Sequence, residues 1–281
     1  MTTYANNAKD ILVLAATGKT GRRLVRRLRE AGESVRAASR SAQVRFDWSD
    51  PATWEPAVAG AAAVYLVAPD DPAPVGDFVK LAAGAGAERF VALSGGGIEA
   101  VGPGFGEGMA EGERAVRDSG AQWTVLRPNN FFQNFSEDLW HRPLREGRLA
   151  LPIGEVPEPF VDAEDIAEVA AAVLTGPDHH HGRVYGLSGP RALTFRAAVE
   201  TIARAAGRPM RFEELTPEDY AAELRAEGHP EAAVTALGAL FAMHRGGHSA
   251  EPADGVQQVL GREPRSLEAY AAQAAAAGAW A

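Results

Sequence analysis

Cysteine is absent from the 281-residue sequence. Disulfides, thiolate metal sites and a cysteine nucleophile are therefore excluded, and the composition suits a reducing compartment. An unbroken apolar run of the roughly 18 to 20 residues that a bilayer-spanning helix needs is absent too. Residues 1–10 are polar and contain no apolar signal-peptide core. We therefore expect a soluble, cytoplasmic protein that does not bind membranes.

Positive charge is scarce, because 28 Lys and Arg residues stand against 37 Asp and Glu residues, for a net charge of −9. Phosphate backbones are bound by clustered positive charge, so nucleic acid is excluded as a general partner. The one basic cluster, at residues 22–29, has the spacing of a solvated helix face, with Leu24, Val25 and Leu28 turned inward.

Motifs of several enzyme classes are also missing. Neither a Gly-x-Ser-x-Gly nucleophile elbow nor a phosphate-binding P-loop occurs, which removes those hydrolase classes. His179, His180 and His181 are adjacent, but adjacent histidines rarely converge on one ion and no carboxylate pattern accompanies them. We therefore expect no metal site.

The first half of the sequence contains a regular alternation of short apolar runs and helical patterns. Strand-like runs occupy residues 11–14, 34–39, 63–67, 89–94 and 123–126. Helical patterns occupy residues 22–29, 75–85 and 107–119, and a further short helix is expected to begin at residue 51. Such alternation produces right-handed βαβ units and a parallel sheet with helices on both faces. We predict an α/β fold, a Rossmann-type doubly wound parallel sheet, for residues 1–150.

Residues 151–281 are mainly helical in pattern. Helices are expected at 162–174, 194–206 and 230–244 and from residues 216 and 266, with one strand at 184–187. Asp162 and Thr194 have the character of N-caps, and Asp165 would support the first turn after Asp162 rather than form an acid pair with it. We expect this half to supply the remaining core elements and a smaller, mainly helical substrate lobe that does not fold independently.

A glycine turn, residues 15–21, lies directly between the first strand and the first helix. Gly18 and Gly21 would let the backbone approach a pyrophosphate, and the helix start would offer N–H groups and a positive dipole end to the phosphates. At the head of a βαβ series the turn favours a dinucleotide site. We expect cofactor contacts from Thr17, Gly18, Lys19, Thr20, Gly21 and Arg22.

The end of the second strand indicates which dinucleotide is bound. NAD-selective sites place a carboxylate there, whereas this strand ends Ser39-Arg40-Ser41. A guanidinium can pair with a 2′-phosphate, so Arg40, supported by Ser39, predicts NADP(H), with NAD(H) less favoured. The alternative, an ordinary exposed loop arginine, stays open. Asp47 and Trp48 would suit the adenine edge.

Several segments taken together resemble a known family. They are the glycine turn, the Arg40 position, Phe46-Asp47-Trp48, Leu93-Ser94-Gly95, and residues 120–129, 160–167 and 260–266. Their order is similar to the NmrA-like branch of the atypical short-chain dehydrogenases/reductases, over nearly the whole chain. The resemblance implies an NAD(P)-binding protein near the ergot-alkaloid dehydrogenases and quinone-oxidoreductase-like members. Further cofactor contacts are expected from Val67, Ala68, Pro69, Ser94 and Asn129.

The sequence departs from this family in two places. Ala15 stands where the turn usually begins with glycine, and its methyl group would crowd the tightest part of the turn. Phe105 and Met109 stand where conventional members carry a Tyr-x-x-x-Lys pair for proton transfer, although this branch often lacks the pair. Substrates that accept a hydride with little help from a protein acid, such as iminium ions, quinones or enones, are therefore favoured.

Polar and aromatic residues around and after the fifth strand are candidates for the substrate side. Ser94, Asn130 and His141 are candidate catalytic groups, but Ser94 could instead cap the loop at residues 95–97. Asn129 and Asn130 could hydrogen-bond the nicotinamide carboxamide or simply build a turn. Core packing accounts equally well for the aromatic spacing. Pocket contacts are expected from Asn130, Phe131, Asn134, Phe135 and His141.

The leading hypothesis is an NADPH-dependent reductase of a small, aromatic metabolite in bacterial secondary metabolism. Rate enhancement would come mainly from proximity and orientation. Two alternatives stay open: a non-catalytic redox sensor that binds NADP(H), for which NmrA is the model, and a redox-neutral enzyme that catalyses cyclisation or isomerisation. The expected partner is a small-molecule substrate, and the sequence leaves the oligomeric state open.

Overall fold

The computed structural model describes residues 10–100 and 105–281. The polar start, residues 1–9, on which the expected location in the cell partly rests, lies outside this range. Within the described ranges, none of the helices combines the length and the apolar character that crossing a bilayer requires.

A seven-stranded sheet forms the centre of the fold, with strand order β3-β2-β1-β4-β5-β6-β8. Its strands are β1 (Asp10–Val13), β2 (Val35–Ser39), β3 (Val44–Arg45), β4 (Ala61–Val67), β5 (Arg89–Leu93), β6 (Gln122–Pro128) and β8 (Arg183–Leu187). Neighbouring strands from β3 across to β6 pair in parallel. This is the strand order of a doubly wound Rossmann sheet. The order in which successive strands are added reverses between β1 and β4, although the strands stay parallel. The predicted fold class is confirmed.

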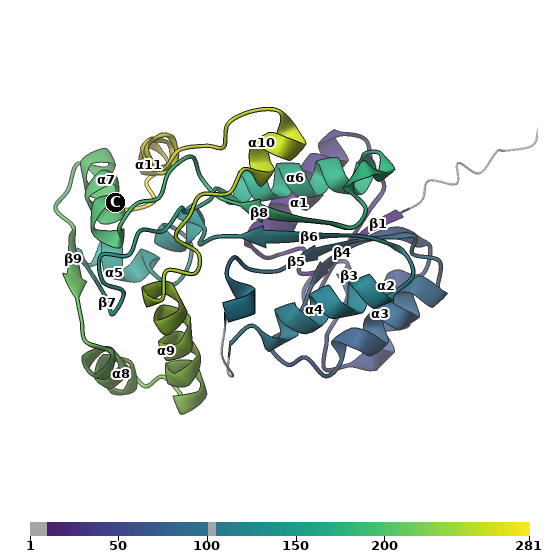
Figure 1. Ribbon diagram of the computed structural model, residues 1–281, viewed down its shortest axis with the longest axis horizontal. Helices are drawn as coiled ribbons and strands as arrows, with labels where there is room; N and C mark the ends of the chain where they lie inside the picture. Colours follow the sequence, from purple (N-terminus) through teal and green to yellow (C-terminus); the bar gives the residue numbers. More distant parts are fainter. Residues whose placement is uncertain (1–9, 101–104) are drawn as a thin grey trace, which may run out of the picture. The chain divides into compact units, whose positions relative to one another are not determined.

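Helices cover both faces of this sheet (Figure 1). One face carries α1 (Lys19–Glu30) and α6 (Ala163–Thr175), and the other carries α2 (Trp54–Val58), α3 (Val75–Gly84) and α4 (Glu107–Asp118). Helix α1 buries Leu24, Val25 and Leu28, as its spacing predicts. Most of its arginines face solvent, but Arg27 lies 2.5 Å from Glu168 of α6 and so links the two helices of that face.

Two compact units make up the chain. The first consists of the described parts of Met1–Ser94 together with Gly108–Leu126 and Ala167–Val184, and the second consists of the remainder. Because the chain passes from one unit to the other several times, the units do not coincide with the sequence ranges 1–150 and 151–281. The first unit contains the carboxyl ends of β1, β2 and β4, where most of the predicted cofactor residues lie, whereas Asn129 belongs to the second unit.

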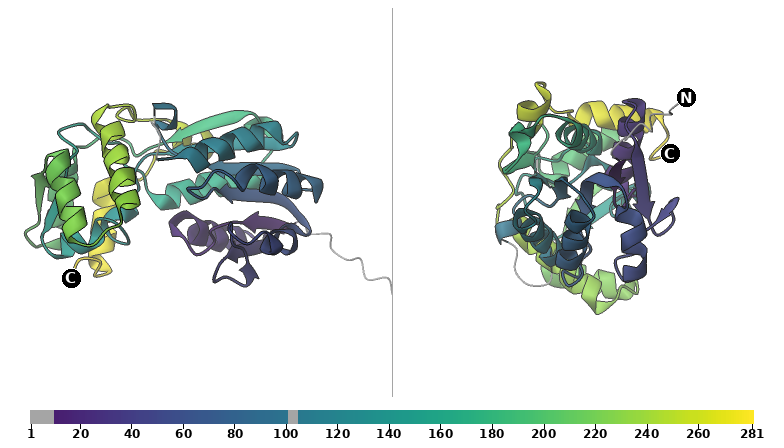
Figure 2. Two further views of the ribbon diagram at one scale, coloured as in Figure 1. Left: turned by 90° about the horizontal axis from the view of Figure 1, so that it is seen from below. Right: turned by 90° about the vertical axis from the view of Figure 1, so that its right-hand side faces the viewer.

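The second unit is mainly helical, and its residues from Tyr185 onward are drawn green to yellow in Figure 2. Its complete α-helices and strands are α5 (His141–Arg145), β7 (Arg148–Leu151), α7 (Phe195–Ala206), β9 (Arg211–Glu214), α8 (Pro217–Ala226), α9 (Glu231–Arg245), α10 (Gly255–Leu260) and α11 (Leu267–Ala276). An aromatic cluster fills its core, where the rings of Phe135, Trp140, Phe160 and Phe195 have centroids 4.8 to 6.4 Å apart. Phe135 is 0% exposed, so its spacing reflects core packing.

The predicted caps of the later helices are present. Thr194 Oγ1 accepts a hydrogen bond from Ala197 N at 3.1 Å, and Gly207 closes α7 with a φ of 64°. Asp162 Oδ1 accepts from Glu164 N at 2.8 Å, ahead of α6. Both helix starts therefore follow from their local sequence.

Asp165 has a role that the sequence did not indicate. Its side chain is 0% exposed and forms ion pairs with Arg262 and Arg265, the first at 2.6 Å. The backbone N–H of Arg265 donates to its second carboxylate oxygen at 2.7 Å. Asp165 thus anchors a segment about 100 residues further along the chain to the start of α6.

Candidate functional site

The turn after β1 is closed by backbone contacts. Gly18 N donates to the Ala15 carbonyl at 2.8 Å, and Arg22 N donates to the Gly18 carbonyl at 3.1 Å. A Cβ atom at Gly21 would lie 2.1 Å from the Ala15 carbonyl oxygen, so a side chain does not fit there. Glycine at this position permits the close approach of helix and turn that a dinucleotide cradle needs.

Ala15 occupies a strained position in this turn. Its φ is 49°, and it is the one non-glycine residue with a positive φ among the described residues. The left-handed conformation costs an L-residue about 1–2 kcal/mol. The crowding expected from alanine at this position therefore appears as backbone strain.

The start of α1 is suited to an anion. Its N-cap is Gly18, and no side chain forms a capping hydrogen bond there. The first N–H groups of any α-helix have no partner within the helix, and they carry the positive end of its dipole. Phosphate groups commonly bind at such positions.

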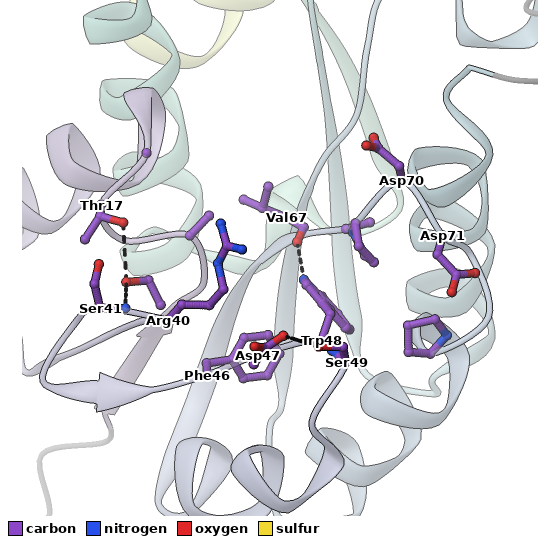
Figure 3. A pocket seen from close by; sticks show the side chains of 16 residues that line it. Thr17, Arg40, Ser41, Phe46, Asp47, Trp48, Ser49, Val67, Asp70 and Asp71 are labelled. Atoms are coloured by element: carbon purple, nitrogen blue, oxygen red, sulfur yellow. Dashed lines mark hydrogen bonds between the residues drawn. The ribbon is translucent and has the colours of Figure 1, made fainter. Parts of the chain in front are cut away.

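A cavity of about 660 Å³ lies at the carboxyl ends of β1, β2 and β4, where the sheet order reverses (Figure 3). Among the predicted cofactor residues, those that line it are Thr17, Gly18, Ser39, Arg40, Asp47, Trp48, Val67, Ala68 and Pro69. Its volume lies within the range of small-molecule sites, and its place at the topological switch point is where open α/β sheets bind ligands.

Arg40 is exposed, and its guanidinium projects into this cavity between Thr17 and Val67 in the view of Figure 3. Within residues 10–100 and 105–281, no hydrogen bond or ion pair engages the guanidinium. Five N–H donors are thus available to a ligand with oxygen acceptors. A 2′-phosphate is such a ligand, and it matches the fork of an arginine.

Asp47 and Trp48 form the floor of the cavity on the side of β3. Asp47 Oδ1 accepts from the Ser49 hydroxyl at 2.7 Å and from Ser49 N at 3.0 Å, and these bonds hold the pKa of the carboxyl below its usual value, with Arg40 and Arg45 contributing. Trp48 Nε1 donates to the Val67 carbonyl at 3.2 Å. The loop is therefore fixed to β4 and presents a negative charge beside Arg40.

The Ser39 hydroxyl holds the loops of the cavity together. Thr17 Oγ1 lies 3.3 Å from Ser39 Oγ, and Ser41 N donates to the same oxygen at 3.3 Å. Ser39 is 8% exposed. Its hydroxyl connects the turn after β1 to the turn after β2, so it holds the two loops of the cavity in place.

The remaining predicted cofactor residues lie outside the lining of this cavity. Lys19, Thr20, Gly21 and Arg22 form the first turn of α1. Ser94 is 4% exposed and its hydroxyl donates to Glu113 at 2.7 Å, an arrangement that neither interpretation of this serine included. The contacts predicted for these residues stay predictions.

Other residues of the cavity were not predicted. These are Ala15, Ser41, Phe46, Ser49, Asp70, Asp71 and Pro74. Since the carboxyl ends of neighbouring parallel strands share one edge of a sheet, the prediction for Val67, Ala68 and Pro69 could have been extended along the same loop to Asp70 and Asp71. How far the cavity-lining segment after β4 extends toward Pro74 depends on where α3 begins.

Asn129 and Asn130 follow β6 and lie in the second unit. Asn129 Nδ2 donates to Glu158 at 3.0 Å and to the Ser249 carbonyl at 2.8 Å. Asn130 Nδ2 lies 2.9 Å from His244 Nε2. Neither Glu158 nor His244 was a candidate from the sequence, because both are far from Asn130 along the chain.

The other predicted pocket residues contribute to the packing of the second unit. His141 Nε2 lies 2.7 Å from the Ala279 carbonyl, so it binds the C-terminal segment. Asn134 is 7% exposed, and Phe131 forms an isolated bridge with Val161. Within the described part of the chain, no group of three or more His, Asp or Glu side chains is placed to hold a metal ion.

Comparison with known proteins identifies the relatives of this chain. The model of the NmrA-like family matches residues 7–272. A reductase of (4-alkanoyl-5-oxo-2,5-dihydrofuran-3-yl)methyl phosphate from Streptomyces griseus is 35% identical, covering 95% of this chain and 98% of its own. Agroclavine dehydrogenase from Claviceps fusiformis is 30% identical, covering 91% and 93%.

A solved structure shows the same fold. The NADPH-dependent quinone oxidoreductase QOR2 of Escherichia coli, crystallised with NADPH, superimposes with a TM-score of 0.78 and 20% identity over 94% of this chain and 99% of its own. The family match covers nearly all of this sequence, and the relatives span it almost from end to end. The chain belongs to the NmrA-like family.

Proposed function

We propose that the protein is an NADPH-dependent reductase that delivers a hydride to a small, conjugated organic acceptor. The observation that carries the proposal is the cavity at the switch point of the sheet, which combines a glycine cradle with the Arg40 guanidinium. The names of relatives support a reductase, since they are a reductase, a dehydrogenase and a quinone oxidoreductase.

The residues of the cavity fit a dinucleotide with a 2′-phosphate. Gly18 and Gly21, where a Cβ would lie 3.1 and 2.1 Å from the Ala15 carbonyl oxygen, would admit the pyrophosphate to the start of α1. Arg40 would hold the 2′-phosphate, and Asp47 would face the adenine edge. The bound cofactor supplies the hydride, and the protein supplies orientation and exclusion of water.

The acceptor is proposed from the chemistry that needs least help from the protein. Quinones, enones and iminium ions accept a hydride directly, and the aligned positions Phe105 and Met109 offer no acid. We assign the acceptor to the mainly helical second unit. Bacterial secondary metabolism in the cytoplasm is the proposed setting, and the Streptomyces relative supports only its bacterial part.

The test measures oxidation of NADPH by the purified protein in the presence of menadione, cyclohexenone or a dihydroisoquinolinium salt. The loss of NADPH absorbance reports the rate. The proposal expects enzyme-dependent oxidation with at least one acceptor, and slower oxidation when NADH replaces NADPH. Binding of NADPH without oxidation by any of the three would contradict a reductase and favour a redox sensor.

A further inference from the structure

A buried carboxylate in the second unit, Glu158, is surrounded by hydrogen-bond donors. Its Oε1 accepts from Asn129 Nδ2 at 3.0 Å and from Asn130 N at 3.1 Å. Its Oε2 lies 3.0 Å from His244 Nδ1 and 3.3 Å from Ser249 Oγ. Glu158 is 2% exposed and His244 is 5% exposed. Four donors around one carboxylate compensate for the cost of burying its charge.

The contacts of His244 match one tautomer of its ring. An ionised carboxylate only accepts hydrogen bonds, so the contact with Glu158 requires a hydrogen on Nδ1. In the neutral ring Nε2 is then an acceptor, and it receives a hydrogen from Asn130 Nδ2 at 2.9 Å. A doubly protonated ring would donate at Nε2 and would need the Oδ1 atom of Asn130 there. The network is therefore a chain from carboxylate to imidazole to carboxamide.

Asn130 is the exposed end of this chain. Its side chain is half-buried, whereas Glu158 and His244 behind it are buried. Its backbone is held on both sides, because its N–H donates to Glu158 and its carbonyl accepts from Val161 N at 2.8 Å. Among the described residues, no further hydrogen bond engages the Asn130 carboxamide. Its second amide hydrogen is therefore available to a ligand.

The position of Asn130 along the chain places it where ligands bind. It lies two residues after Pro128, the last residue of β6, and the Gly96 N–H of the loop after β5 donates to the Pro128 carbonyl at 2.9 Å. The loops that follow two neighbouring parallel strands thus meet beside Asn130. In open α/β sheets the ligand site lies outside these carboxyl ends.

We propose that Asn130 donates a hydrogen bond to the carbonyl oxygen of the acceptor, and that His244 and Glu158 are positioning residues that hold its carboxamide. This inference rests on the proposed reductase function and deepens it, because it names conjugated carbonyl compounds, enones and quinones, as the substrate class. An iminium ion has no oxygen on which the hydrogen bond could act.

The chemistry places negative charge where Asn130 can reach it. When a hydride adds to the β-carbon of an enone, the electron pair of the carbon–carbon double bond moves onto the carbonyl oxygen. The Asn130 N–H stabilises that oxyanion, and a proton from water then completes the reduction at carbon. The hydride carries two electrons and one hydrogen, and water supplies the second hydrogen.

His244 and Glu158 act on this step through orientation. Because His244 Nε2 accepts an amide hydrogen, the Nδ2 atom of Asn130 rather than its Oδ1 atom faces the imidazole. The carboxamide is thereby held in one orientation. Glu158 in turn keeps the hydrogen of the imidazole on Nδ1. Without them the carboxamide could rotate and present its oxygen to the developing oxyanion, which would oppose the reaction.

A double-mutant cycle tests this arrangement. With menadione as acceptor, Asn130→Ala is expected to lower kcat/KM about 100-fold, the cost of one oxyanion donor, without changing the Kd for NADPH. His244→Phe is expected to lower it about 10-fold, and the double variant is expected to be no worse than Asn130→Ala alone. With the dihydroisoquinolinium salt, Asn130→Ala is expected to cost much less.

Two further variants separate positioning from folding. His244→Gln keeps an acceptor near the place of Nε2 and is expected to recover most of the rate lost in His244→Phe. The matched control His229→Phe, at a histidine whose side chain is 44% exposed, is expected to behave as the wild type. Losses that multiply in the double variant, or equal losses with the iminium and carbonyl acceptors, would overturn the inference.

Nitrogen NMR of the seven histidines supplies a readout that does not depend on turnover. We expect the His244 signals, assigned by their loss in His244→Gln, to show a hydrogen on Nδ1 and an Nε2 shift that moves in Asn130→Ala. If NADPH binds but no acceptor is reduced, the reductase proposal fails while this result still supports the hydrogen-bonded chain. A hydrogen on Nε2, unmoved by Asn130→Ala, overturns the chain itself.

Discussion

At the scale of single residues, we propose that Arg40 determines which dinucleotide is preferred. A charge-assisted hydrogen bond contributes about 1.5–3 kcal/mol, so Arg40→Ala should weaken NADPH binding about 10- to 100-fold and leave NADH binding unchanged. Calorimetric titration of both dinucleotides measures this. The control is Arg45→Ala, an exposed arginine whose carboxylate partner is Asp50 at 3.5 Å. Equal losses for NADH, or from Arg45→Ala, would contradict the assignment.

Ala15 carries backbone strain that glycine would relieve. Ala15→Gly is expected to raise the free energy of unfolding by about 1 kcal/mol, because glycine adopts a positive φ at no steric cost. Urea denaturation measures the change. Ala16→Gly is the control, since Ala16 has no positive φ and should lose about 0.5–1 kcal/mol in the same experiment. A destabilised Ala15→Gly variant would show that the strain is absent.

Sequence reasoning identifies the residues of the site that follow a strand directly. Thr17, Gly18 and Arg40 belong to the turns after β1 and β2, so strand pattern and chemistry together indicate them. Glu158 and His244 could not be found in this way. They come within hydrogen-bond distance of Asn130 only through tertiary packing, and nothing in their local sequence distinguishes them from other acidic residues and histidines.

At the scale of the elements, the contact between α1 and the turn before it depends on Gly21. Gly21→Ala would place its Cβ 2.1 Å from a backbone carbonyl oxygen, so the helix must move. We expect a loss of about 1–3 kcal/mol in urea denaturation, together with weaker NADPH binding.

Gly84→Ala serves as the matched control for this contact. Gly84 is in α3, and a Cβ there meets no atom within 4 Å. The substitution should therefore stabilise the protein by about 0.5–1 kcal/mol through helix propensity. Similar effects of the two substitutions would mean that Gly21 does not make the close approach described.

The strands that form the centre of the sheet were predictable, and several peripheral elements were not. Buried strands such as β4 read as continuous apolar runs. In contrast, β3 has two residues, α5 has five, and β9 carries Arg211, Glu213 and Glu214. These elements form because a neighbouring strand pairs with them or a neighbouring helix packs against them. Their own sequences therefore show no helical or strand-like spacing of apolar residues that would identify them.

At the scale of the whole molecule, ion pairs of a buried carboxylate connect segments that are distant in sequence. Asp165→Asn removes the charge that Arg262 and Arg265 share, and should lower the free energy of unfolding by about 2 kcal/mol, since both arginines are partly exposed. The control is Asp178→Asn at a 74% exposed carboxylate paired with Arg89, where less than about 1 kcal/mol is expected. Equal losses in urea denaturation would contradict a special role for Asp165.

We propose that the cavity beside the glycine turn binds a phosphorylated nicotinamide dinucleotide for reduction. Parallel titration of the purified protein with NADPH, NADP⁺, NADH and NAD⁺ tests it most directly. We expect NADPH to bind most tightly, and both phosphorylated forms to bind more tightly than NADH and NAD⁺. Equal affinity for NADH and NADPH, or no binding of any of the four, would contradict it.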